Sequence, residues 1–138
     1  MPLMDLVRRS DVIVLCAADT AKSRHVIDRR AIAAMRKGCV LVNVGRSMLI
    51  DMPALVRRLR RDDMVAMLDV FDREPLEKRS PLRRLRNAYL TPHRAGGLLA
   101  SVQRAFVMLT DDLEACLKGR RRTLAITRAM ASRIPDSG

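Results

Sequence analysis

Short apolar runs alternate along this chain with longer stretches in which apolar residues recur at helical spacing. The apolar runs are rich in β-branched residues and are predicted to form strands at residues 11–15, 39–44, 64–70 and 87–91. The run 11–15 is apolar almost throughout, which predicts a strand buried on both faces.

The intervening stretches carry the start and stop signals of helices. They are predicted at residues 1–9 (the tail of an amphipathic helix), 28–38, 51–61 and 97–117, with a short helical turn opened by Ser80-Pro81. Asp28 and Asp51 are the expected N-caps, and Gly38 and Gly119 the expected stops. Strands separated by such helices predict βαβ crossovers and a mostly parallel sheet with helices on both faces.

Length and composition support one compact globular domain. Of the 138 residues 49% are apolar and only 2% aromatic, so the core is expected to consist of aliphatic side chains and methionine. No apolar run approaches the roughly 20 residues of a membrane span, and the first residues lack the apolar region of a signal peptide. Cys16, Cys39 and Cys116 have no metal-ligand spacing and are expected to be reduced, partly buried cysteines of a cytoplasmic protein.

The formal net charge of +12 raises the question of a nucleic-acid partner. The arginines occur in short clusters on several elements and are not interleaved with stacking aromatics. This distribution favours solvated faces over a functional polyanion surface, so a nucleic-acid partner is disfavoured.

Four polar residues follow predicted strands and are therefore expected at one edge of the sheet: Arg46, Asp69, Glu74 and His93. Each alone is more typical of an ordinary surface or loop residue, but the combination favours chemistry. A guanidinium suits a carboxylate anchor, and an imidazole beside a carboxylate suits proton transfer, as reduction of a 2-oxo acid requires. Asp69 is suited to bind a nicotinamide carboxamide, and His25 is expected to pack or face solvent.

The segments that carry this pattern are residues 10–13, 35–38, 43–51, 68–75, 90–97 and 116–119, and in combination they resemble the D-isomer-specific 2-hydroxyacid dehydrogenases. The resemblance covers roughly residues 4–119. It implies that Arg46 binds the substrate carboxylate and carbonyl, that His93 is the acid/base, and that Glu74 pairs with it. It also implies that NAD or NADP is held by a set of residues comprising Asp69, Val44, Gly45 and Gly96.

Three features depart from the family pattern. Ser47 stands where the family usually has glycine, and Asp62-Asp63 replaces a small turn. More seriously, no G-x-G-x-x-G motif occurs in the sequence, so the helix N-terminus that receives the pyrophosphate is not expected here. The expected fold is therefore α/β, a partial Rossmann-type doubly wound parallel sheet with flanking helices that lacks the first βαβ half. It would span residues 1–119, followed by a poorly ordered tail at 120–138.

These observations predict a fragment of a cytoplasmic NAD(P)-dependent D-2-hydroxyacid dehydrogenase that acts on a small 2-oxo or 2-hydroxy acid. The missing half would come from a second polypeptide, a frameshifted upstream reading frame or a misplaced start codon. Homo-oligomerisation or a complementing chain would then cover an unpaired edge strand at residues 11–15. Two alternatives stay open: a non-catalytic remnant that serves as an interaction module, and a basic polyanion-binding protein.

Overall fold

The computed structural model describes residues 1–132 of the chain. The chain divides into two compact units, Met1–His93 and Arg94–Gly138. The domain limits expected from the sequence, 1–119 and 120–138, stay a prediction.

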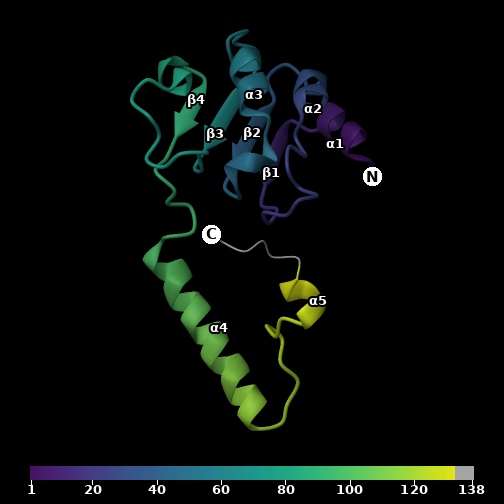
Figure 1. Cartoon of the computed structure of the whole chain (residues 1–138), viewed down its shortest axis with the longest axis vertical. Helices are drawn as coiled ribbons and strands as arrows, with labels where there is room; N and C mark the ends of the chain where they lie inside the picture. Colours follow the sequence, from purple (N-terminus) through teal and green to yellow (C-terminus); the bar gives the residue numbers. More distant parts are fainter. Residues whose placement is uncertain (133–138) are drawn as a thin grey trace. The chain divides into compact units, whose positions relative to one another are not determined.

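The first unit is an α/β unit built around a four-stranded parallel sheet in the order β1-β2-β3-β4 (Figure 1). Its elements in chain order are α1 (Leu3–Arg9), β1 (Val12–Leu15), α2 (Arg29–Ala34), β2 (Val40–Asn43), the 3-10 turn η1 (Ser47–Leu49), α3 (Met52–Leu59), β3 (Val65–Leu68), the 3-10 turn η2 (Pro81–Arg84) and β4 (Ala88–Leu90). Every strand predicted from the apolar runs is present, and the parallel arrangement is confirmed.

The register brings the carboxyl ends of the strands to one edge of the sheet. Asn43 at the end of β2 pairs with Leu15 of β1 on one side and Leu68 of β3 on the other, and Leu68 in turn pairs with Leu90 of β4. The loops that follow β2, β3 and β4 therefore leave the sheet at the same edge.

The core lies on one face of the sheet only. Along β1, Ile13 and Leu15 are buried, whereas Val12 and Val14 are 57% and 55% exposed. Met67 of β3 is exposed on the same open face. The expectation of a strand buried on both faces is thus wrong, because α1, α2 and α3 contribute their buried residues to a single core cluster and no helix within Met1–His93 covers the other face.

The helix starts agree with the predicted caps. The carboxylate of Asp28 accepts a hydrogen bond from the Ala31 amide at 2.7 Å, and that of Asp51 accepts one from the Ala54 amide at 2.9 Å. The α2 helix ends at Ala34 and not at Gly38, since Met35 is already extended.

Two interpretations of individual side chains were wrong. Arg58, expected on a solvated face, is only 7% exposed and bonds to Asp63 at 2.8 Å and to the Met35 carbonyl at 3.1 Å. The Arg58 guanidinium is held by carbonyls that helix α2 leaves unpaired at its end, and a charge pattern in the sequence does not reveal this need.

Of the three free cysteines, Cys39 is buried, but Cys16 and Cys116 are exposed and not partly buried.

The second unit contains α4 (Leu99–Leu117), which agrees with the predicted long helix, and α5 (Arg128–Ala131) within the stretch that showed no clear sequence pattern. Gly119 follows α4 with φ +63°, a left-handed conformation that favours glycine. The expected fraying at 135–138 lies outside the described residues. Among the described helices, none is long and apolar enough to cross a membrane.

Candidate functional site

The loop after β2 is shaped by Asn43, a fully buried residue at the end of that strand. Its amide nitrogen donates to the Arg46 carbonyl at 2.9 Å, and its side-chain oxygen accepts from the Gly45 amide at 3.1 Å. These two bonds fold residues 43–46 into a tight turn that projects Arg46 from the edge of the sheet.

Gly45 is required by this turn for steric reasons. A Cβ at that position would meet the Leu15 carbonyl at 3.2 Å, the Ala17 carbonyl at 3.1 Å and a methyl group of Leu49 at 3.1 Å. The Gly45 backbone therefore lies directly against the end of β1, and a side chain would push the two loops apart.

Asp69 follows β3 and is almost fully buried, at 3% exposure. Its carboxylate accepts a hydrogen bond from the Thr91 hydroxyl, and its backbone carbonyl accepts the amide of His93 at 2.9 Å. The end of β3 is thereby joined to the segment after β4, and His93 is held with φ +52°, in the left-handed region that non-glycine residues rarely adopt.

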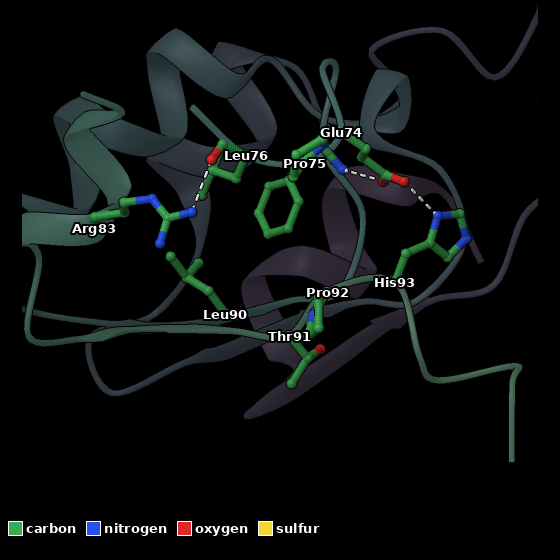
Figure 2. Close-up of a pocket in the computed structure, with 9 residues that line it drawn as sticks. Glu74, Pro75, Leu76, Arg83, Leu90, Thr91, Pro92 and His93 are labelled. Carbon is green, nitrogen blue, oxygen red and sulfur yellow. Dashed lines mark hydrogen bonds and ion pairs between the residues drawn. The ribbon is translucent and has the colours of Figure 1, made fainter. Parts of the chain in front are cut away.

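The side chains of Glu74 and His93 are hydrogen-bonded to each other. Nδ1 of His93 lies 2.7 Å from Oε2 of Glu74, while Oε1 of Glu74 accepts the Phe71 amide at 3.0 Å (Figure 2). Both bonds favour the ionised carboxylate, and the one from His93 is the main reason that the pKa of Glu74 lies below its ordinary value. An ionised carboxylate can only accept, so Nδ1 carries the hydrogen and Nε2 is left for proton exchange with a ligand.

This pair lies at a cavity of about 370 Å³, a volume suited to a small molecule. Its lining includes Glu74 and His93 together with Thr91, Pro92 and Arg83 (Figure 2). The guanidinium of Arg83 is directed to the backbone, where it donates to the carbonyls of Leu76 at 2.7 Å and Glu77 at 3.0 Å. Arg83 therefore fixes the loop that carries Glu74 and does not offer a free fork to a ligand.

The structure does not bring Arg46 into this cavity. Arg46 is exposed, and its Nη1 donates to the carbonyl of Gly45 at 2.9 Å. Within the described residues, no hydrogen bond or ion pair joins Arg46 to Glu74 or His93. All three nevertheless lie on loops that leave the same edge of the sheet.

The remaining predicted residues are more loosely placed. Val44 is 38% exposed, directly after β2. Gly96 belongs to the second unit, and a Cβ there would have nothing within 4 Å, so its own surroundings impose no need for glycine. His25 is exposed and its backbone amide bonds to the Met48 carbonyl at 2.8 Å, in line with the expectation that it packs or faces solvent.

Two positioning residues were missed by sequence reasoning, Asn43 and Thr91. Asn43 ends an apolar strand directly before Gly45, and a polar residue at the last position of a buried strand is the signal that could have identified it. Thr91 precedes Pro92 and His93, but nothing in its local sequence shows that it pairs with Asp69, 22 residues earlier.

Comparison with known proteins identifies the family. The model of the D-isomer specific 2-hydroxyacid dehydrogenase NAD binding domain matches residues 1–95. The chain belongs to this dehydrogenase family. The resemblance noted in the sequence motifs is thereby confirmed, and the parallel sheet of the first unit is part of the Rossmann-type fold of the family's NAD-binding domain.

Among relatives of the 2-hydroxyacid dehydrogenase family, a glyoxylate reductase of Aeropyrum pernix is 36% identical over 119 residues, which are 86% of this chain and 36% of that protein. A D-3-phosphoglycerate dehydrogenase of Methanocaldococcus jannaschii is 36% identical over 116 residues, or 83% of this chain and 22% of the relative. The chain thus spans about a third or less of the length of these curated relatives.

Solved structures show the same fold. A D-isomer specific 2-hydroxyacid dehydrogenase from Xanthobacter autotrophicus in complex with NADPH and MES superposes with a TM-score of 0.77 at 26% identity, covering 91% of this chain and 51% of that one. A second structure, the TT0316 protein of Thermus thermophilus, gives a TM-score of 0.71 at 34% identity over 88% of this chain and 39% of the other.

Proposed function

We propose that this chain provides the catalytic edge of an NAD(P)-dependent D-2-hydroxyacid dehydrogenase, which transfers hydride between nicotinamide and a small 2-oxo or 2-hydroxy acid. The observation that carries the proposal is the contact of 2.7 Å between His93 Nδ1 and Glu74 Oε2, at a cavity beside the carboxyl ends of the strands. Ligands of open parallel sheets bind at that edge. Membership of the family adds independent support.

His93 is the proton donor in reduction and the acceptor in oxidation. With Nδ1 held by Glu74, Nε2 is the atom that delivers a proton to the carbonyl oxygen as the substrate carbon is reduced. Glu74 orients the ring, because its carboxylate accepts the hydrogen of Nδ1 and its pKa lies below the ordinary value. The left-handed backbone at His93, fixed by the bond to the Asp69 carbonyl, sets where the ring stands.

Arg46 binds the substrate carboxylate, since a guanidinium fork pairs with both carboxylate oxygens. The ends of β2 and β4 are separated by one strand, so their Cα positions stand about 10 Å apart at the usual strand spacing. A small carboxylic acid bound at this edge would lie between the loop of Arg46 and that of His93, once the Arg46 side chain has turned toward it. In the structure Nη1 bonds to the Gly45 carbonyl, so substrate binding exchanges that bond for one to the carboxylate.

Asp69 is the residue suited to hold the nicotinamide carboxamide, and NAD(H) or NADP(H), when bound, supplies or accepts the hydride. The fit is partial. Asp69 is 3% exposed and already accepts from Thr91, so only a small part of its carboxylate reaches a ligand. The contribution proposed for Val44, Gly45 and Gly96 is close backbone approach to the cofactor, and for Gly45 the crowding around a Cβ gives a structural reason as well. No G-x-G-x-x-G motif is available in this sequence to receive the pyrophosphate.

The remaining parts of a complete site belong to a complementing segment or a second copy of the chain. Two observations support this: β1 is an edge strand of the sheet, and on its open face Val12 and Val14 are more than half exposed. A cytoplasmic location is supported by three cysteines that are all free in the structure.

The test is a chimera in which residues 4–119 replace the matching segment of the Aeropyrum pernix glyoxylate reductase, so that the relative supplies the parts not spanned here. We expect NADH- or NADPH-dependent reduction of glyoxylate, followed by loss of absorbance at the nicotinamide band. Asp5→Asn, a change of an exposed residue remote from the strand ends, serves as the control and is expected to keep the activity. A folded chimera that binds the cofactor but reduces neither glyoxylate nor hydroxypyruvate would refute the proposal.

A further inference from the structure

A second and larger hollow lies on the first unit, between helix α3 and the loop that follows β3. It has a volume of about 630 Å³ and is formed by one side of α3 together with residues 71–82. We refer to it as the α3 groove. Its volume falls in the range of sites for small organic ligands, and neither Arg46 nor His93 lines it.

The floor of the α3 groove is apolar. Val56 of α3 and Leu82 of η2 are 9% and 3% exposed, and Phe71, Leu76 and Met52 are partly buried around them. An occupant of this groove therefore needs an apolar body, because a polar one would lose its hydration without gaining partners.

Cationic side chains line the α3 side of the groove. Arg57 and Arg60 stand three positions apart at the end of α3, which places them on one face of the helix. Both are exposed, and among residues 1–132 neither guanidinium group takes part in a hydrogen bond or an ion pair. They contrast with Arg58 between them, which is buried and donates to Asp63 and to two backbone carbonyls.

The loop side of the groove carries charges that are partly compensated. Arg73 pairs with Glu77 at 3.0 Å. Asp72 also lines the groove, but no arginine or lysine nitrogen of the described residues lies within 4.0 Å of its carboxylate. The uncompensated positive charge is thus concentrated on the α3 side, next to the apolar floor.

We propose that the α3 groove binds an amphipathic carboxylate, with an alkyl chain on the apolar floor and the carboxylate group between the guanidinium groups of Arg57 and Arg60. Two guanidinium groups can together donate several charge-assisted hydrogen bonds to one carboxylate. The net charge of +12 on the whole chain attracts anions to the surface in general, while the floor selects those with an apolar tail.

The α3 groove also contacts the loop that holds Glu74. Phe71 lines both the groove and the cavity of His93, and its backbone amide donates to Glu74 Oε1 at 3.0 Å. A ligand in the groove should therefore shift the carboxyl resonance of Glu74. Binding itself does not depend on the dehydrogenase proposal and is measured without turnover.

The experiment titrates the isotope-labelled full chain with octanoate and, in parallel, with neutral 1-octanol, and follows amide and carboxyl resonances by NMR. We expect saturable shifts at Val56, Phe71 and Leu82, with octanoate binding about tenfold more tightly than octanol, as a charge-assisted hydrogen bond implies. The double variant Arg57→Gln/Arg60→Gln should lose that factor of about ten.

The matched control is Arg29→Gln/Arg30→Gln on α2, which removes two exposed arginines and changes the net charge equally. It should bind octanoate as the unchanged chain does. An equal loss of octanoate affinity in both double variants would mean that the arginines act only by long-range attraction, and it would overturn the proposal. Equal affinity for octanol and octanoate, shifts confined to other apolar surfaces such as α4, or no saturable binding would overturn it as well.

Discussion

Replacement of Arg58 by methionine tests whether this buried cation holds the first unit together. The side chain is 7% exposed and donates to Asp63 at 2.8 Å, to the Met35 carbonyl at 3.1 Å and, more weakly, to the Ala33 carbonyl at 3.3 Å. Methionine keeps most of the apolar stem but removes the hydrogen bond from Arg58 to each of the three acceptors.

The expected cost follows from those contacts. Loss of a donor to a buried carbonyl costs about 1–3 kcal/mol, and breaking a buried ion pair costs about 3–5 kcal/mol. The second figure is reduced here because Asp63 keeps Arg61 at 3.3 Å and is itself 14% exposed. We therefore expect the free energy of unfolding to fall by about 2–4 kcal/mol.

Urea denaturation followed by circular dichroism measures this loss. Arg57→Met is the matched control. Arg57 is the exposed neighbour of Arg58 and its guanidinium is unpaired among the described residues, so its replacement should change the free energy of unfolding by no more than about 0.5 kcal/mol. A loss below about 1 kcal/mol for Arg58→Met, or equal losses for the two variants, would refute the reasoning.

Three further predictions concern the sheet edge and its helices. Gly45→Ala should lower the free energy of unfolding by about 1–3 kcal/mol, measured in urea, because its Cβ would meet the Leu15 carbonyl at 3.2 Å; unchanged stability would show that the turn relaxes freely. Asp51→Ala should cost about 1 kcal/mol in the same assay through loss of the α3 cap, and Asp51→Asn much less; equal losses would contradict the capping role. His93→Gln should raise the pKa of the Glu74 carboxyl toward its ordinary value, which carbon-13 NMR from pH 2 to 7 measures. An unchanged Glu74 pKa would mean that His93 does not stabilise the ionised carboxylate.

The order and type of the elements could be predicted from the sequence because the apolar period and the capping aspartates are local signals. Asp28 and Asp51 begin their helices as expected. Burial was harder to predict. Val12 and Val14 are apolar, as in a parallel sheet that helices cover on both faces. The helices of the first unit, however, all pack on the face that carries Ile13 and Leu15.

For the site, the spacing of motifs predicted which loops meet but not which side chains touch. Glu74 and His93 form the expected pair, since the Phe71 amide holds the Glu74 carboxylate and the Asp69 carbonyl holds the His93 backbone. Arg46 instead turns back onto the Gly45 carbonyl, and the side-chain rotamer of an exposed arginine has no signal in the sequence. The bond between Thr91 and Asp69 joins the segments that follow β3 and β4, and it has no local sequence signal.

The role of His93 is tested most directly by stopped-flow measurement of a single turnover in the chimera described above. Excess enzyme with bound NADH would be mixed with glyoxylate, and the nicotinamide absorbance followed. We predict that His93→Ala slows the oxidation of NADH by about 10²–10⁴-fold while the affinity for NADH is kept, since only the proton donor is removed. A His93→Ala chimera that turns over at the rate of the unchanged chimera would contradict the assignment of His93 as the acid/base.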